Sequence, residues 1–361
     1  MKASWHSLSA ALKKYRNILI YVKGSPDPDA IASSFAMSVI CRELGISSTI
    51  ITTKKISLPE NRVLVQLLDI PLHISPDFSE FKRHDAYIVV DHQTADLPQA
   101  GSSLPCAAHI DHHDPPEQEA PADFMLRNTE VGSTSTIMAL IMREMSPQSG
   151  EPVITAVATA LLYGIYTDTD KYSRAGHLDY EAMDYLSRFS DHDIFNRISA
   201  TPLSQATLQL LKTAIQNKIP YKDWLMAGIG YADASDRDSI AIIADFLLKR
   251  EVYNTVIVFA AIEENEGHRL TLDASFRTTS ETLHLDRIIK NITSEGGARK
   301  FKGAYQINLD YISYCPEREL VWSVISDATI ELLKKSRDEL YLTEIRGFYR
   351  SMRKKIQDYF S

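Results

Sequence analysis

Cysteine is scarce in this sequence, and no cysteine has a neighbouring partner in the chain. Only three occur among 361 residues: Cys41, Cys106 and Cys315. None stands in a CxxC pair, so neither a disulfide framework nor a cysteine zinc site is expected. So few thiols fit a reducing compartment, and we expect a cytoplasmic protein.

Long apolar runs and an excess of positive charge are also missing. No apolar stretch approaches the roughly 18 residues of a membrane-spanning helix, and residues 1–17 lack the apolar region of a signal peptide, so no membrane association is expected. Lys plus Arg total 39 against 47 for Asp plus Glu, a net charge of −8. Because this charge repels polyanions, a phosphate-rich ligand would need a local site or metal ions.

The composition and length predict two folded domains. Hydrophobic residues make up 44% and charged residues 24%, as in ordinary globular proteins, and the chain is about twice as long as one domain. We expect an α/β protein with an N-terminal domain that contains a parallel sheet and a smaller C-terminal α/β domain. The predicted segments are the first domain (1–190), a helical linker (191–223), the second domain (224–335) and a helical tail (336–361).

The N-terminal half alternates short apolar runs with segments of helical spacing. Strands are expected at 17–22, 48–52, 86–90 and 107–110, and a helix at 30–44. This alternation predicts a parallel sheet, in which ligands collect at the carboxyl ends of the strands. Acidic residues follow these predicted strands and a later helix: Asp27, Asp29, Asp91, Asp111 and Asp168.

Four short segments carry the candidate chemistry. They are PDPDA at 26–30, VDH at 90–92, IDHH at 110–113 and YTDT at 166–169. Carboxylates combined with imidazoles suit a divalent ion such as Mn²⁺, and a carboxylate that bridges two ions is typical of two-metal hydrolytic sites. Asp91 is the natural bridge. The segments therefore predict a metal centre that activates water for attack on a phosphoryl group.

Each segment also has a structural interpretation. Asp27 and Asp29 are suited to a turn and a helix N-cap, Asp111 to His113 to a solvated loop, and Asp168 to a surface position. Four acidic segment ends within one α/β domain are hard to explain as four independent caps. The combination favours metal binding.

The ordered motifs PDxDA, VVDH, DHH and GIxTDT resemble those of the DHH phosphoesterase superfamily. DHH itself stands at Asp111, His112 and His113, and the chain is most similar to the RecJ-like, oligoribonuclease and nucleotide phosphatase type. The resemblance implies one metal bound by Asp29, Asp91, His112 and Asp168, and another bound by Asp27 and Asp91 with a further histidine. It also implies that Asp91, His112 and His113 are catalytic, with His113 contacting the scissile phosphate.

The second half resembles the nucleic-acid-binding DHHA1 domain that commonly accompanies a DHH domain. The resemblance rests on Ser275-Phe276-Arg277 and on Gly296-Gly297. It implies that this domain holds the substrate, through the residues Arg277, Gly296 and Gly297. The basic residues Arg299 and Lys300 follow directly, and we expect them to contact the substrate as well. Residues 295–303 are expected to form a glycine-rich basic loop, for which a solvated turn is the alternative, and a buried ion pair is the alternative for Arg277.

The chain departs from the family pattern at two histidines. Lys23 stands where the family has the metal-binding histidine of its first motif, and Ala298 replaces the histidine of the GGH loop. We expect Lys23 to lie beside two or three carboxylates, where its ammonium group would take the place of the first metal. A metal ligand rebuilt from His92 is an alternative, although a loop position is expected for His92.

The expected function is a Mn²⁺-dependent phosphoesterase with one or two ions per chain. The implied substrates are small nucleotides, such as short oligoribonucleotides, 3′-phosphoadenosine 5′-phosphate and dinucleotides, and a homodimer is possible. One alternative is a manganese pyrophosphatase of the same superfamily, whose basic C-terminal motif is similar to residues 353–355. Another is a non-catalytic nucleotide sensor, in line with the two histidine replacements.

Overall fold

The computed structural model of the chain divides it into two compact units, Met1–Pro202 and Leu203–Ser361. It describes residues 2–56, 58–76, 79–97, 103–264 and 269–360, and for residues 2–3, 79–80 and 340–360 it describes the backbone alone. Each unit has its own sheet, which confirms the predicted two-domain α/β fold. The predicted boundaries at residues 190 and 223 stay predictions.

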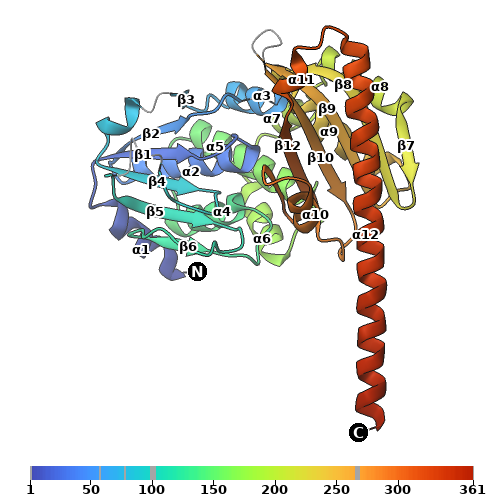
Figure 1. Cartoon of the computed structure of the whole chain (residues 1–361). Coiled ribbons are helices and arrows are strands. Elements are labelled where there is room, and N and C mark those ends of the chain that lie inside the picture. Colours follow the sequence, from blue (N-terminus) through green and yellow to red (C-terminus); the bar gives the residue numbers. More distant parts are fainter. Residues whose placement is uncertain (1, 57, 77–78, 98–102, 265–268, 361) are drawn as a thin grey trace. The chain divides into compact units, whose positions relative to one another are not determined.

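Unit 1 contains a six-stranded sheet in which all neighbouring strands are parallel, as predicted (Figure 1). The order is β3-β2-β1-β4-β5-β6. Its strands are β1 (Asn17–Val22), β2 (Ser47–Thr52), β3 (Leu72–Ile74), β4 (Ala86–Val90), β5 (Cys106–Asp111) and β6 (Met125–Arg127).

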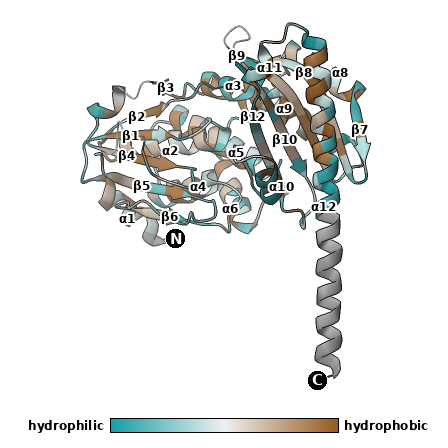
Figure 2. Ribbon diagram, viewed as in Figure 1, coloured by the Kyte–Doolittle hydropathy of each residue, from teal (hydrophilic) through white to brown (hydrophobic). Residues whose placement is uncertain are grey.

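The central strands of this sheet are buried on both faces. In β1, Ile18, Ile20 and Val22 belong to the larger apolar core, whereas Leu19 and Tyr21 belong to a smaller core on the other face. Continuous apolar runs of this kind are typical of parallel strands. Figure 2 shows the same strands as a hydrophobic layer.

Seven α-helices of unit 1 are described, and those next to the sheet bury its larger core. α2 packs against β1, β2 and β4, whereas α1 and α4 pack against β5. The helices are α1 (Lys2–Leu12), α2 (Pro28–Glu43), α3 (Pro59–Leu67), α4 (Thr134–Met145), α5 (Glu151–Asp168), α6 (His177–Leu186) and α7 (His192–Ser199). Asp168 is the last residue of α5.

Unit 2 is built on a mixed six-stranded sheet in the order β11-β12-β10-β9-β8-β7. Of these neighbours, β8 and β9 are parallel and the other pairs are antiparallel. The strands are β7 (Lys218–Tyr221), β8 (Trp224–Asp233), β9 (Thr255–Glu264), β10 (Arg269–Thr278), β11 (Gly296–Ala298) and β12 (Lys302–Asn308). Part of the expected basic loop at 295–303 is therefore the edge strand β11.

Helices cover both faces of the second sheet. α8 (Gln205–Gln216) packs against β8, and α9 (Ser239–Arg250) packs against β9 and β10. On the other face, α10 (Leu285–Ile292) packs against β11 and β12, and α12 (Arg318–Phe360) packs against β8. The short helix α11 (Asp310–Ser313) lies next to β10.

The predicted helical tail is part of α12, which runs for 43 residues. Its basic residues 353–355 lie outside the residues whose side chains are described. Among the described residues, none of the helices combines the length and apolar character needed to cross a lipid bilayer.

Candidate metal centre and substrate pocket

The strand order brings the predicted acidic segments of unit 1 together. β1, β4, β5 and β6 are consecutive in the sheet, so the residues after their carboxyl ends share one edge. Asp91 directly follows β4 and has a backbone φ of 56°. This left-handed conformation costs about 1–3 kcal/mol for a non-glycine residue, and such strain concentrates at functional sites.

Asp29 lies fully buried in the first turn of α2. Its two carboxylate oxygens each accept a hydrogen bond of 2.7 Å from the backbone of α4, one from the N–H of Thr134 and one from that of Ser135. Asp27 is the N-cap of the same helix, because its Oδ1 accepts from the N–H of Ala30 at 2.9 Å. The cap interpretation therefore holds for Asp27, and Asp29 caps a neighbouring helix.

Close helix packing positions Asp168 near the same edge. Where α5 meets α2 and α4, Gly164 is so tightly packed that a Cβ atom there would lie 2.3 Å from Oγ of Ser135 and 3.2 Å from Cα of Asp29. The absence of a side chain therefore allows α5 to pack tightly against the residues that hold Asp29. The next turn of α5 carries Asp168.

His112 connects the carboxylates. Its Nε2 lies 3.2 Å from Oδ2 of Asp168 and 3.6 Å from Oδ1 of Asp91, and it makes no well-aligned hydrogen bond to either. Asp91 also accepts a hydrogen bond of 3.0 Å from the hydroxyl of Thr134. The structure thus brings together the predicted residues Asp29, Asp91, His112 and Asp168.

The negative charge of the carboxylates in this cluster exceeds the positive charge close to them. Burial, together with the charge of Asp168, raises the pKa of Asp29 to about 7. Burial and the charges of Asp29 and Asp27 raise the pKa of Asp91 well above its usual range. Burial would lower the pKa of His112, but the carboxylates of Asp168 and Asp29 outweigh it and raise that pKa to about 9.

This donor set fits a divalent cation. Ligand atoms of Asp91, His112 and His113 lie within 4.8 Å of one another, and so do those of Asp29, His112 and Asp168. Oxygen and imidazole donors with an uncompensated negative charge suit ions such as Mn²⁺ or Mg²⁺. Neither of these two sets includes Asp27, although its charge acts on both Asp29 and Asp91.

Asp111 holds the ring of His113 through the Nδ1 atom. Its Nδ1 lies 2.6 Å from Oδ1 of Asp111, and the other oxygen of that carboxylate pairs with Arg127 at the end of β6. Burial would raise the pKa of Asp111, but the hydrogen bond from His113 and the charge of Arg127 lower it to about 2. Asp111 is therefore a carboxylate that orients His113.

Lys23 and His92, whose roles the sequence left open, both contact Thr94. Nζ of Lys23 lies 2.7 Å from Oγ1 of Thr94 and 2.7 Å from Oδ1 of Asp96, a carboxylate outside the predicted set. His92 belongs to a turn in which its Nδ1 lies 2.9 Å from the backbone oxygen and 3.1 Å from the backbone nitrogen of Thr94. Burial and the charge of Lys23 lower the pKa of His92.

Sequence reasoning missed Arg127 and the contact of Thr134 with Asp91. β6 has only three residues, too few for a detectable period, so nothing marked Arg127 as a strand end. Both Ser133 and Thr134 are typical helix-capping residues, and Ser133 is the N-cap of α4, where its Oγ accepts from the N–H of Thr136 at 3.1 Å. The run of hydroxyl residues at 133–136 was the sequence signal for the helix N-cap and for the hydroxyl contact with Asp91.

The predicted substrate residues of unit 2 differ in their exposure and in their contacts. Arg277 forms an ion pair, with Nε 2.8 Å from Oδ1 of Asp245, but the side chain of Asp245 is 41% exposed, so the pair is not fully buried. Gly296 packs so tightly that a Cβ atom would lie 2.7 Å from side-chain atoms of Ile289 and Tyr305. Arg299 and Lys300 are exposed, and Nζ of Lys300 lies 3.7 Å from Oε2 of Glu281. Gly297 is exposed next to them.

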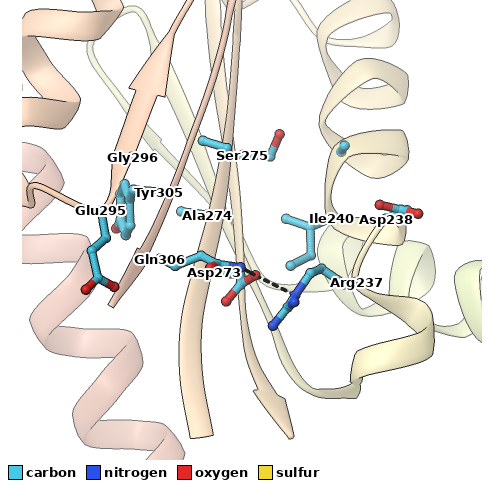
Figure 3. Close-up of a pocket in the computed structure, with 12 residues that line it drawn as sticks. Arg237, Asp238, Ile240, Asp273, Ala274, Ser275, Glu295, Gly296, Tyr305 and Gln306 are labelled. Carbon is cyan, nitrogen blue, oxygen red and sulfur yellow. Dashed lines mark hydrogen bonds and ion pairs between the residues drawn. The ribbon is translucent and has the colours of Figure 1, made fainter. Parts of the chain in front are cut away.

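A pocket of about 610 Å³ lies in unit 2 between the start of α9 and the strands β10, β11 and β12 (Figure 3). Its volume suits a small molecule. Nε of Arg237 lies 2.9 Å from Oδ2 of Asp273, which also accepts a hydrogen bond of 2.8 Å from the amide of Gln306. The remaining lining residues are Asp238, Ile240, Ala241, Ala274, Ser275, Glu295, Gly296, Ala304 and Tyr305.

This pocket is poorly suited to a phosphate group. Arg237 is the one cation among its lining residues, and it is paired with Asp273 and with Oε1 of Glu264 at 3.0 Å. In the first turn of α9, the N–H of Ile240 bonds to the backbone oxygen of Arg237 at 3.2 Å, and that of Ala241 bonds to the backbone oxygen of Asp238 at 3.1 Å. An uncharged ring or sugar fits these surroundings better than an anion.

Residues 17–165 match the family model "DHH family, N-terminal domain". A protein of Methanocaldococcus jannaschii without an assigned function is 30% identical over 319 residues, which cover 88% of this chain and 63% of that protein. The chain therefore spans less than two thirds of the length of this relative.

A solved structure shares the fold of this chain. An exopolyphosphatase-related protein from Bacteroides fragilis superposes with a TM-score of 0.69 at 17% identity, over 93% of this chain and 97% of that chain. Exonuclease RecJ bound to manganese gives a TM-score of 0.46 at 10% identity, over 86% of this chain and 91% of that chain. At 17% identity, the first of these comparisons supports the two-unit α/β fold.

Proposed function

Because residues 17–165 belong to the DHH family of phosphoesterases, we propose that this chain hydrolyses phosphodiester or phosphomonoester bonds of small nucleotides with the help of Mn²⁺. One observation carries the proposal. Nε2 of His112 lies between the carboxylates of Asp168 and Asp91, at 3.2 Å and 3.6 Å, in a cluster with more carboxylates than cationic groups. These residues and Asp29 would hold the metal.

The bound metal would neutralise charge on phosphoryl oxygens and promote the ionisation of a water molecule. The chain's own residues prepare this centre. The amides of α4 fix the carboxylate of Asp29, and the hydroxyl of Thr134 fixes that of Asp91. His113 supplies a second imidazole, whose ring centre lies 4.3 Å from that of His112 and which is free to contact a phosphoryl oxygen through Nε2.

The choice of nucleotides as substrates rests on unit 2. A pocket that disfavours phosphate but accommodates a ring or sugar is expected for a substrate with a nucleoside part. A polyphosphate or pyrophosphate would present only anionic groups to it. The net charge of −8 supports short substrates over long nucleic acids, which normally require an extended basic groove.

A substrate panel tests this function. Purified protein with Mn²⁺ is incubated with pApA, 3′-phosphoadenosine 5′-phosphate, a cyclic dinucleotide and pyrophosphate, and the products are separated by chromatography. We expect turnover of at least one nucleotide and at least a ~100-fold loss in Asp91→Asn. Asp184→Asn is the matched control, because Asp184 is exposed and pairs with Arg188 on the surface.

Two results would contradict the proposal. Turnover of pyrophosphate alone would indicate the pyrophosphatase alternative. Tight nucleotide binding without turnover and without bound Mn²⁺ would indicate a sensor.

A further inference from the structure

Asp179 is a fully buried carboxyl group of unit 1 that is not among the proposed metal ligands. It lies in the first turn of α6. Its Oδ2 accepts hydrogen bonds from the N–H of Gly176, the N-cap of α6, at 2.7 Å and from the N–H of Gly132 at 3.1 Å. Its Oδ1 accepts from the same N–H of Gly132 at 3.0 Å and from the hydroxyl of Thr136 at 2.5 Å. Asp179 therefore links the start of α6 to the start of α4.

Two carboxyl groups hold the N-terminus of α4. The N–H groups of the first two residues of α4 donate to Asp29, each at 2.7 Å, and the hydroxyl of the third residue donates to Asp179. The first N–H groups of a helix have no partner within the helix, so such side chains determine where they point. The position of this N-terminus therefore depends on Asp179 as well as on Asp29.

Glycine at position 132 allows the close contact with Asp179. A Cβ atom there would lie 2.4 Å from Cγ2 of Thr169 and 3.0 Å from Oδ2 of Asp179. Thr169 is fully buried and directly follows the proposed ligand Asp168. The backbone that leads into α4 is therefore packed between Asp179 and the residue next to a ligand.

We propose that Asp179 is a positioning residue for the metal centre, because it fixes the start of α4 and thereby the groups that orient Asp29 and Asp91. Those groups are the two N–H groups bound to Asp29 and the hydroxyl of Thr134, which donates to Asp91 at 3.0 Å. The inference rests on the proposed function, in which these carboxylates hold the metal. It adds a residue whose hydrogen-bond partners, among the described residues, include none of the proposed ligands.

The variant Asp179→Asn keeps the size of the side chain and replaces one acceptor oxygen by an NH₂ group. Each oxygen of Asp179 faces a backbone N–H, that of Gly132 for Oδ1 and that of Gly176 for Oδ2. The NH₂ group is expected at the Oδ1 site, because the hydroxyl of Thr136 can accept a hydrogen bond as well as donate one. There it opposes the N–H of Gly132. The substitution should therefore loosen the start of α4.

The competing interpretation is that Asp179 only stabilises the fold, as a capping residue of α6. Asp85 provides a matched control, although it is exposed. Its Oδ2 accepts from the N–H of Arg16 at 2.9 Å and its Oδ1 from the N–H of Asn17 at 3.1 Å, so Asp85→Asn also sets an NH₂ group against a backbone N–H. These bonds lie at the amino end of β1, whereas the metal centre follows the carboxyl ends of the strands.

The first test requires neither metal nor activity. Hydrogen exchange of the full-length, metal-free chain is followed by NMR at the amides of Thr134 and Ser135, and at the amide of Ile88 in the buried strand β4, which reports global unfolding. Relative to Ile88, both amides should exchange about 10-fold faster in Asp179→Asn than in the wild type, as expected when a buried donor loses its acceptor. In Asp85→Asn this ratio should match the wild type.

The second test is calorimetric titration with Mn²⁺. Asp179→Asn should lower the affinity about 10-fold, the effect found when supporting partners of metal ligands are removed, and Asp85→Asn should keep the wild-type affinity. Thr136→Val, which removes the hydroxyl that donates to Asp179, should also lower the affinity, whereas Thr136→Ser should preserve it. Thr136→Val replaces Asp179→Asn in both tests if the latter does not fold.

Unchanged relative exchange at Thr134 and Ser135 in Asp179→Asn would overturn the inference, as would an affinity for Mn²⁺ equal to that of Asp85→Asn. A wild type that binds no Mn²⁺ would instead contradict the proposed function. In that case the exchange test still decides whether Asp179 fixes the start of α4.

Discussion

Of the three carboxylates Asp29, Asp91 and Asp168, that of Asp168 is the most accessible. Its side chain is 25% exposed, whereas that of Asp91 is 3% exposed and Asp29 is fully buried. Asp29 and Asp91 also take part in hydrogen bonds that hold α4 in place. A substitution at Asp168 therefore tests metal binding with the least damage to the fold.

We predict that Asp168→Ala lowers the affinity for Mn²⁺ at least ~10-fold, because His112 and Asp29 lose the third member of their ligand set. The melting temperature of the metal-free protein should change little. Calorimetric titration with Mn²⁺ measures the affinity, and Asp184→Ala serves as the surface control. Unchanged metal binding in Asp168→Ala would remove this residue from the centre.

At the scale of helices and strands, the metal centre depends on the close contact of α2, α4 and α5. Gly164 allows this contact, since any side chain there would collide with Ser135 and approach the backbone at Asp29. Glycine in a helix interior normally costs about 1 kcal/mol relative to alanine. Close packing explains why glycine is used in spite of this cost.

Gly164→Ala should therefore destabilise the protein by about 1–3 kcal/mol, as expected for overpacking, and weaken Mn²⁺ binding. Gly150→Ala is the matched control, because a Cβ atom there would meet its nearest neighbour, Cδ of Pro152, at an ordinary 3.8 Å. Urea unfolding gives both free energies. A stabilised Gly164→Ala would mean that the helices have room to spare.

Strands and helices with a clear apolar pattern could be predicted from the sequence. Short elements, and contacts between residues far apart in the chain, could not. β1 and β4 are apolar runs that end at a loop or an aspartate, so their strands and the position of Asp91 were evident. β11 consists of Gly296, Gly297 and Ala298, which have low β-propensity, and it forms through pairing with β12. The ion pair of Arg277 with Asp245 depends on tertiary packing, which local patterns do not encode.

At the scale of the whole molecule, the carboxylate cluster makes stability depend on pH and on metal. The pKa values of Asp29, Asp91 and His112 are all raised in the folded chain. The metal-free folded state therefore binds more protons than the unfolded state above the ordinary histidine pKa of about 6.5. Under this condition stability falls as pH rises.

We predict that, in EDTA, the free energy of unfolding decreases between pH 6.5 and 9, by up to about 1.4 kcal/mol per pH unit for each extra proton. His112 contributes to this loss until pH passes its folded pKa of about 9. Mn²⁺ should reverse the trend, because a cation favours the ionised carboxylates. Urea unfolding at several pH values measures this effect, and His112→Asn should flatten the slope in EDTA.

A stability that rises with pH in EDTA would show that the folded chain holds no extra protons in this range. The carboxylates would then be compensated without a metal. Asp111 does not affect this window, since its pKa of about 2 places its contribution at much lower pH.

The central claim is that the carboxylates and histidines at the edge of the first sheet bind a divalent metal. Anomalous diffraction at the manganese absorption edge, from crystals of the full chain grown with Mn²⁺, tests it most directly. We expect an anomalous peak within coordinating distance of His112 and at least two of Asp29, Asp91 and Asp168. A map with no peak at these residues, or with manganese bound only elsewhere on the chain, would contradict it.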